Sequence, residues 1–211
     1  MNDEVLEITQ TENTDNADYF DLLLGLFDEH AHHKREKGDF FENLTLEIFK
    51  NSVFFTERFD FAEVMLWGDF SRAYKVEQKK DYGVDLVART KNGEFFAIQC
   101  KCLAQKRLDL DKLKTFLTWG EFERNDGGEP IEISRRFLFH TCREITKEAW
   151  QALNQKKGIP CEIFDYAKLK EMQFDWKTAF EKRDPKGIAN RKKLEFQDHQ
   201  KAAFAEIVRH F

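Results

Sequence analysis

An acid, an amide and a lysine lie close together in the segment "DYGVDLVARTKNGEFFAIQCK", residues 81–101. Side chains alternate along a strand, so Gln99 and Lys101 share one face and Cys100 points to the other. Asp85 could bind a divalent cation directly, with the Gln99 amide oxygen and the Cys100 backbone carbonyl as neutral ligands. Mg²⁺ prefers such hard oxygens and keeps waters, one of which can act as a nucleophile. Lys101 would orient that water and offset charge on a phosphate, so the pattern favours metal-assisted phosphodiester hydrolysis. Mg²⁺ is the expected ion, with Mn²⁺ as an alternative.

Two other interpretations of the same strands remain open at this level. The polar residues also fit a half-exposed sheet face on which they have no catalytic role. On the opposite face, Cys100 and Cys102 could join Cys142 and Cys161 in a zinc site. A C-x-C pair in a strand is more typical of small hydrophobic side chains, and four irregularly spaced cysteines do not form a secreted disulfide framework.

The turn between the two strands decides whether Asp85 and Gln99 can meet. A two-residue turn "NG" would direct the Asp85 side chain away from Gln99. A three-residue loop "KNG", with Gly93 in the left-handed conformation, instead pairs Thr90 with Glu94 and Asp85 with Gln99. The chemistry therefore predicts an odd-length loop or a bulge near Asp85.

The charge distribution points to a nucleic-acid partner although the net charge is −5. Residues 1–30 hold nine Asp and Glu and no Lys or Arg, so the remainder is +4. Residues 72–114 hold eleven basic and six acidic residues. A moderate positive patch thus coincides with the segment quoted above, where contacts to phosphates would be useful.

The hydrophobic pattern predicts an α/β fold with a mixed sheet, because clusters of strands alternate with helices. Helices are expected from Asn16 or Asp18 toward His33, and again after Gly38. The segment 63–70 is ambiguous. The remaining expected elements are strands at 73–79, 84–90 and 94–102, a helix at 109–120, a strand at 135–142, a helix N-capped by Thr146 and running to Lys157, a strand at 161–166 and a short helix from Ala167.

The quoted residues resemble a known nuclease motif. "YGVDLVA…GEFFAIQCK" is similar to the motif of the Mrr-like branch of the PD-(D/E)xK nucleases in its glutamine variant, with Asp85, Gln99 and Lys101 on the motif positions. Upstream, "GDFFENL" resembles the G-x-x-F-E helix of that branch, which would make Glu42 an additional acid facing the metal. Gln99 stands where the family more often has an acid, and Glu42 would restore that charge. The resemblance implies a restriction-endonuclease-like mixed β-sheet flanked by helices, with a helical N-terminal extension.

The broader run "VMLWGDF…DYGVDLVA…AIQCK…LFHTC…EIFDYAKL" resembles the N-terminal nuclease domain of type ISP restriction-modification enzymes. These enzymes join nuclease, helicase-like translocase and methyltransferase in one polypeptide. The segment "KKLEFQDHQKAAFAEIVRHF" is similar to the first helix of a superfamily-two helicase core, where Gln200 would help to read adenine. ATP would act only through that helicase domain. The implied division is an acidic arm and N-terminal helix (1–37), a nuclease domain (38–172), a linker (173–191) and the start of a helicase-like domain (192–211).

The expected function is that of a Mg²⁺-dependent DNA endonuclease domain, with double-stranded DNA and the helicase and methyltransferase domains of the same polypeptide as partners. One alternative is a non-catalytic DNA-binding or coupling module of a helicase, and another is a stand-alone nuclease for junctions or damaged DNA. No apolar run approaches the roughly 18 residues of a membrane span, and the N-terminus lacks a signal peptide. We therefore expect a cytoplasmic protein with no membrane partner.

Overall fold

The computed structural model describes residues 15–77, 80–103, 107–155 and 158–182. Its helices and strands follow one another in this order: α1 (Asn16–His30), α2 (Lys34–Asn51), α3 (Val53–Phe59), β1 (Phe61–Leu66), α4 (Trp67–Ala73), β2 (Leu86–Thr90), β3 (Phe95–Lys101), β4 (Arg107–Leu108), the 3-10 helix η1 (Leu110–Lys112), α5 (Lys114–Thr118), β5 (Glu121–Phe122), β6 (Ile131–His140), β7 (Glu144–Ile145), α6 (Lys147–Leu153), β8 (Cys161–Phe164), α7 (Tyr166–Lys170) and α8 (Trp176–Glu181).

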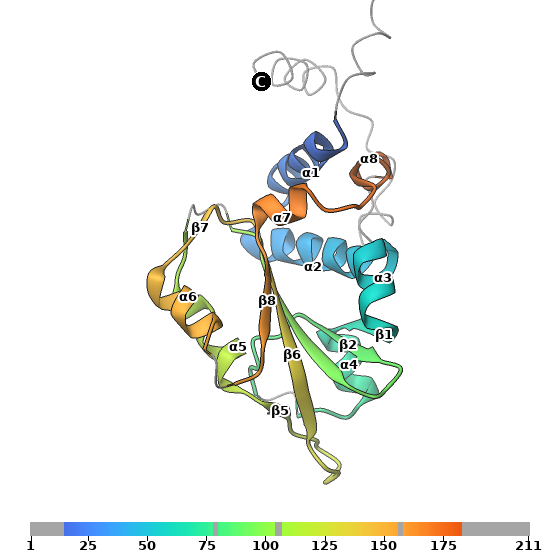
Figure 1. Ribbon diagram of the computed structural model, residues 1–211, viewed down its shortest axis with the longest axis vertical. Helices are drawn as coiled ribbons and strands as arrows, with labels where there is room; N and C mark the ends of the chain where they lie inside the picture. The colour runs from blue at the N-terminus through green and yellow to red at the C-terminus, as the bar shows by residue number, and fades with distance from the viewer. Residues whose placement is uncertain (1–14, 78–79, 104–106, 156–157, 183–211) are drawn as a thin grey trace, which may run out of the picture.

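A mixed six-stranded sheet forms the centre of the molecule (Figure 1). Its strand order is β1-β2-β3-β6-β5, and β8 also pairs with β6. The strands β1, β2 and β3 are antiparallel neighbours, whereas β3, β6 and β8 run parallel to one another. The long connection from β3 to β6 carries η1 and α5, as a parallel crossover requires. The predicted α/β fold with a mixed sheet is confirmed.

Helices α2, α3 and α7 lie against one face of the sheet, and α1 and α8 pack on the outer side of this helical layer (Figure 1). Helix α2 places Phe41, Leu44, Ile48 and Phe49 at three-and-four spacing, and all four are buried against apolar residues of β2 and β3. Two further apolar clusters, centred on Phe122 and on Leu138, fill the opposite face. The abundant phenylalanines are thus concentrated in the layer between α2 and the sheet, where α2 is held in a fixed position over the end of β3.

Helix α2 begins at Lys34, whereas the sequence predicts a start after Gly38. The side chain of His33 accepts a hydrogen bond from the Glu36 backbone N–H at 3.2 Å. The Glu36 carboxylate in turn accepts one from the His32 N–H at 3.0 Å. This reciprocal cap satisfies two backbone donors and starts the helix a turn earlier, so Gly38 lies in its interior.

Two predicted elements are wrong. The strand expected at 73–79 is absent from its described residues, where Val76 makes only an isolated bridge to Arg124. The edge strand is β1 instead, and it lacks clear alternation because Val64 and Leu66 pack on one core cluster while Met65 packs on the other. The helix expected at 109–120 divides into η1 and α5 at Leu113, whose φ of −113° interrupts the helix while its side chain stays fully buried.

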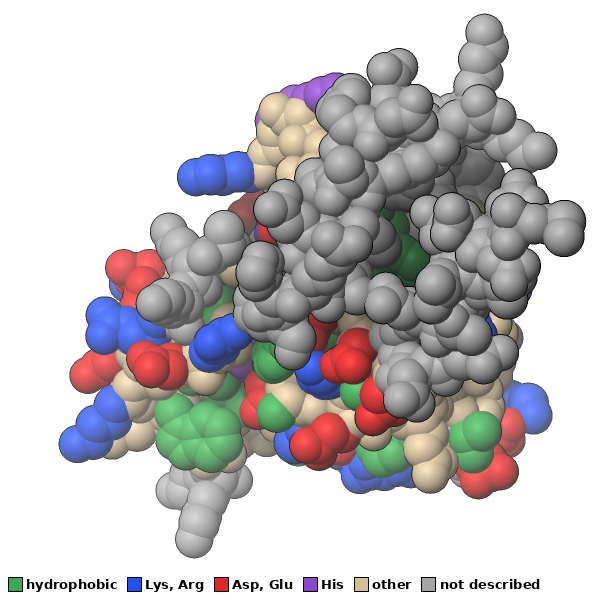
Figure 2. Space-filling view, turned by 90° about the horizontal axis from the view of Figure 1, so that it is seen from above, with side chains coloured by type: hydrophobic (Ala, Val, Ile, Leu, Met, Phe, Trp, Pro, Cys, Tyr) green, Lys and Arg blue, Asp and Glu red, His purple; other side chains and the backbone are tan. Residues whose placement is uncertain are grey.

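The C-terminal part of the described chain packs on α1. Trp176 of α8 is fully buried beside Phe20 of α1, with ring centroids 4.6 Å apart. Helix α8 lies within the segment 173–191, for which the sequence suggests a linker, while Gln200 and the helicase-like segment 192–211 lie outside the described residues. None of the helices in the described ranges is long and apolar enough to cross a membrane. Seen from above, acidic and basic side chains are interspersed over the described part of the surface (Figure 2).

Candidate active site

Asp85 is held by backbone contacts at the point where β2 begins. Its N–H donates to the Ile98 carbonyl at 2.9 Å, and its carbonyl accepts from the Trp67 N–H at 2.8 Å. Its carboxylate oxygen Oδ2 accepts from the Cys100 N–H at 2.6 Å. The preceding turn depends on Gly83, whose φ is +63° and where an added Cβ would lie 2.7 Å from the Phe116 backbone nitrogen. These contacts fix the Asp85 carboxylate beside the end of β3.

The predicted three-residue turn is confirmed. Gly93 has a φ of +88°, and the Thr90 N–H donates to the Glu94 carbonyl at 3.0 Å. The register that follows pairs Leu86 with Ile98, which places Asp85 opposite Gln99. Strand alternation then directs Gln99 and Lys101 to the face opposite that of the apolar residues buried under α2.

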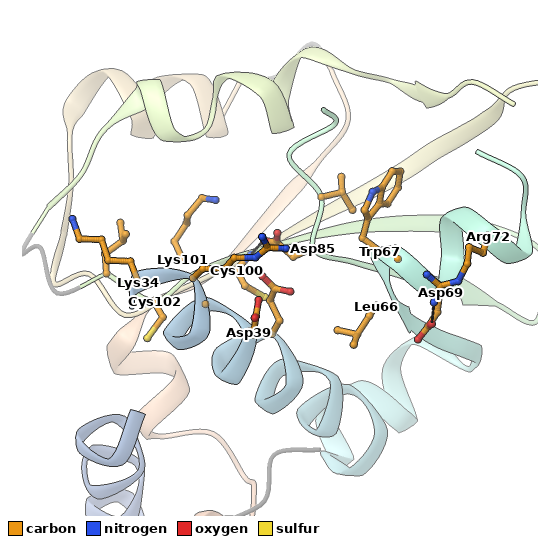
Figure 3. A pocket seen from close by; sticks show the side chains of 16 residues that line it. Lys34, Asp39, Leu66, Trp67, Asp69, Arg72, Asp85, Cys100, Lys101 and Cys102 are labelled. Atoms are coloured by element: carbon orange, nitrogen blue, oxygen red, sulfur yellow. Dashed lines mark hydrogen bonds and ion pairs between the residues drawn. The ribbon is translucent and has the colours of Figure 1, made fainter. Parts of the chain in front are cut away.

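A cavity of about 610 Å³ lies at this end of the sheet, between α2, α4 and the end of β3 (Figure 3). Asp85, Lys101 and Cys100 line it from the sheet, and Glu42 lines it from α2. In Figure 3, Asp85 and Lys101 lie near the middle of the cavity. Three separate elements thus bring two carboxylates and an ammonium together. Within the cavity wall the acidic side chains are Asp39, Glu42, Asp69 and Asp85.

Glu42 and Asp85 are both acids whose surroundings favour the protonated form in the absence of a cation. Burial raises the pKa of Glu42 to about 7, with the negative charges of Asp85 and Asp39 adding to the effect and Lys101 and Arg35 opposing it. Burial also raises the pKa of Asp85, against the lowering effects of Lys101 and the Cys100 N–H. A divalent cation placed between these carboxylates would favour their ionised forms, against the burial that raises the pKa of both.

Gln99 lies beside the cavity but is not one of the residues that line it. Its side chain is 2% exposed, and its Oε1 has no hydrogen-bond partner within the described residues. A hydrogen-bond acceptor left unpaired in the interior costs about 1 to 3 kcal/mol of stability unless a donor or a cation binds it. The amide oxygen next to Asp85 therefore fits a cation ligand, which would supply the missing partner.

The Cys100 backbone is oriented toward Asp85, whereas the Cys100 side chain is not. The N–H and C=O of a strand residue point toward the same neighbour, and the Cys100 N–H donates to Asp85. The Cys100 carbonyl therefore faces the same edge, as its predicted ligand role requires. The thiol lies on the other face, 3.4 Å from the Thr45 hydroxyl, and burial raises its pKa well above the usual value.

The surrounding acids have distinct environments. Asp81 accepts the Gly83 N–H at 2.8 Å and so supports the turn. Asp69 pairs with Arg72 at 2.6 Å on the exposed side of α4. Asp39, on the cavity side of α2, is an acid that the sequence does not single out, although its spacing of three residues from Glu42 places both on one helical face.

No three His, Cys, Asp or Glu side chains in the described ranges are arranged to hold a metal ion by themselves. The cavity does offer the two carboxylates of Asp85 and Glu42. A cation bound there would complete its shell with the Gln99 amide oxygen, the Cys100 carbonyl and water, which is the mixed oxygen set that Mg²⁺ favours.

Stability without metal should fall as the pH rises from about 4.5 to about 7. In that window the folded protein keeps a proton on Glu42 that the unfolded chain has released, so the folded state binds more protons. Glu42→Gln removes this linkage and should stabilise the metal-free protein at pH 8 by roughly 3 kcal/mol, with little change below pH 4.5. Denaturant unfolding in EDTA at both pH values measures the effect. The control Glu57→Gln, at an exposed position on α3, should leave the pH dependence as in the parent, and an equal response of both variants would contradict the shifted Glu42 pKa.

The chain matches one family model and is similar to several solved structures. A family model described as restriction endonuclease (Mrr_cat_2) matches residues 54–186, a range that contains Asp85, Gln99 and Lys101 but not Glu42. Among solved structures, the chain is similar to the "ATP-dependent Type ISP restriction-modification enzyme LlaBIII bound to DNA", with 22% identity and a TM-score of 0.55. The similarity covers 91% of this chain and 11% of that one.

Two further solved structures are more distantly similar. The "DNA modification-dependent restriction endonuclease AspBHI" is 12% identical with a TM-score of 0.42, over 92% of this chain and 40% of that one. The "MspJI Restriction Endonuclease in Complex with 27-mer Oligonucleotide" is 10% identical with a TM-score of 0.46, over 97% of this chain and 43% of that one. No match was found among curated proteins. The sheet and its flanking helices have the restriction-endonuclease-like fold, and since the family model matches more than half of its length, the chain belongs to the restriction endonuclease family.

Proposed function

We propose that this chain is a Mg²⁺-dependent DNA endonuclease domain of a translocating restriction-modification enzyme. The observation that carries the proposal is the convergence of Asp85, Glu42 and Lys101, from three elements, on one cavity. Membership of the restriction endonuclease family supports hydrolysis of DNA phosphodiester bonds as the reaction.

The proposed roles follow from the chemistry of each side chain. Asp85 and Glu42 would hold the cation through carboxylate oxygens, and Gln99 and the Cys100 carbonyl would add neutral oxygens. When bound, the cation supplies charge stabilisation and an acidified water. Lys101 would position the attacking water and donate to a phosphate oxygen as negative charge develops there. The Cys100 N–H holds the Asp85 carboxylate in place during these steps.

A helicase-like domain and a methyltransferase would complete the proposed enzyme. A helicase-like domain beginning in 192–211, with Gln200 reading the adenine of ATP, would couple this nuclease to translocation along double-stranded DNA. The nuclease domain is proposed to span residues 38–172, with α1 and α8 packed on it as parts of the same folded unit. A methyltransferase in the same polypeptide is the further proposed partner, as the resemblance to type ISP enzymes implies.

Cleavage of supercoiled plasmid DNA tests the proposed reaction directly. The chain should nick or cut the plasmid with Mg²⁺ or Mn²⁺ and should leave it intact in EDTA. A chain that binds DNA but cuts none of it with either metal would instead be a non-catalytic coupling module. Cleavage confined to junction-containing or damaged DNA would favour a stand-alone repair nuclease.

Gln99 should contribute to metal affinity as a neutral ligand. Gln99→Ala should weaken Mn²⁺ binding by roughly tenfold, because one oxygen of the shell is lost. Gln99→Glu should preserve or tighten binding, because a carboxylate attracts the cation more strongly than an amide does. Calorimetric titration of Mn²⁺ into the three proteins makes the comparison. Identical titration curves would remove Gln99 from the site.

A further inference from the structure

The cavity wall carries equal numbers of basic and acidic side chains. Four basic side chains, Lys34, Arg35, Arg72 and Lys101, stand against the four acidic ones named above. A DNA strand adds one negative charge for each phosphate, so its approach must be supported by cations that are not already neutralised. A divalent ion bound by the acidic side chains would offset their charge, and the position of the basic side chains would then decide where the strand lies.

The four basic side chains differ in their partners. Arg72 is already paired with Asp69 at 2.6 Å. Lys101 lies close enough to Asp85 and Glu42 to lower the pKa of both carboxyls. Lys34 and Arg35 make no ion pair with any residue in the ranges that the structure describes, and both side chains are exposed, although the charge of Arg35 also lowers the pKa of Glu42.

The two unpaired cations sit on a firmly held part of the fold. They occupy the first turn of α2, between the capping residues His33 and Glu36. The next lysine, Lys37, points elsewhere and pairs with Asp28. In Figure 3, Lys34 lies at one end of the cavity and Arg72 at the other, with Asp85 between them. Lys34 thus lies on one side of the proposed reaction centre, and Arg35 lines the same cavity.

We propose that Lys34 and Arg35 are substrate-positioning residues that bind the phosphates of the DNA strand on one side of the bond to be cut. The strand would run from the start of α2 across Asp85 toward α4. This inference rests on the proposed nuclease function and adds the path of the strand to it. Lys34 would act as a mobile point charge, whereas the planar Arg35 guanidinium can hold one phosphate with two hydrogen bonds.

The salt dependence of DNA binding separates phosphate contacts from a general charge effect. The test compares the parent with Lys34→Ala/Arg35→Ala and with the control Lys50→Ala/Lys147→Ala. The control removes the same charge from exposed positions on α2 and α6 that do not line the cavity. Binding to a short fluorescent duplex is measured with Ca²⁺ in place of Mg²⁺, between about 50 and 200 mM salt.

Lys34→Ala/Arg35→Ala should bind the duplex roughly tenfold more weakly than the parent. The slope of log K against log salt should fall in magnitude by about 2, one for each lost phosphate contact. The control should keep the slope of the parent. Mn²⁺ titration should give the same affinity in all three proteins or a slightly higher one for Lys34→Ala/Arg35→Ala, which shows that the metal site is intact.

An unchanged slope for Lys34→Ala/Arg35→Ala, in a parent that cuts plasmid DNA with Mg²⁺, would overturn this inference and leave the proposed function standing. An equal loss in the control would also overturn it, because the effect would then reflect net charge alone. A parent that neither binds nor cuts duplex DNA would contradict the proposed function itself.

Discussion

Asp85→Ala is expected to reduce DNA cleavage at least ~1000-fold, since losing a metal-activated nucleophile costs about 4 kcal/mol or more and each ~1.4 kcal/mol is tenfold in rate. Asp85 is the acid that the backbone holds most firmly in the cavity, through the Ile98 carbonyl, the Trp67 N–H and the Cys100 N–H. Its removal takes away a charge that Glu42 and Gln99 cannot replace. Plasmid nicking with Mg²⁺ measures the loss.

Three controls separate chemistry from folding. Asp81→Asn removes a neighbouring charge but keeps the acceptor for the Gly83 N–H, so cleavage should stay near that of the parent. Lys101→Ala should abolish cleavage yet retain Mn²⁺ binding, because the lysine acts on water and phosphate. Asp85→Ala itself should fold normally, since it removes a buried acid whose pKa is raised by burial. Cleavage by Asp85→Ala at the rate of the parent would end the assignment of this site.

Trp176→Ala is expected to destabilise the protein by about 3 to 5 kcal/mol, the usual cost of deleting a buried aromatic side chain. Trp176 is fully buried and packs against Phe20 and Phe174, with ring centroids 4.6 and 4.7 Å apart. The loss is a large fraction of the roughly 5 to 15 kcal/mol that stabilises a typical domain. Urea unfolding with and without the substitution measures it.

Trp150→Ala is the matched control, because Trp150 is 52% exposed on α6. This substitution should lower the free energy of unfolding by no more than about 0.5 kcal/mol. If Trp176→Ala costs as little as Trp150→Ala, residues 173–182 do not contribute to the stability of the fold and behave as the linker that the sequence suggests. A large difference between the two tryptophans would instead extend the folded unit beyond residue 172.

The hairpin that carries the candidate site could be predicted because its constraints are local. The three-residue turn with Gly93 at positive φ brings Asp85 opposite Gln99, and a shift of one residue would reverse every side chain of the strand. Helix α2 could also be predicted, because Leu44, Ile48 and Phe49 repeat at helical spacing. Local periodicity and turn chemistry were sufficient at these places.

Tertiary packing decided the features that the sequence did not predict. Strand β1 is contacted from both faces, so its residues lack the alternation that would mark a strand. Leu113 interrupts an apparently regular helix because its burial in the core outweighs helical continuity. Asp39 and the unpaired cations of α2 reach the cavity only because α2 crosses the end of β3. The burial of Gln99 is likewise a result of tertiary packing.

The most direct test of the account is the position of a bound cation. Crystals of the chain grown with Mn²⁺ should show an anomalous peak in the cavity about 2.1 Å from an Asp85 carboxylate oxygen, with Glu42 and the Gln99 Oε1 or the Cys100 carbonyl completing the protein ligands. At a Mn²⁺ concentration that supports cleavage, a cavity without a peak, or a peak whose ligands exclude Asp85, would contradict the proposed metal-dependent active site.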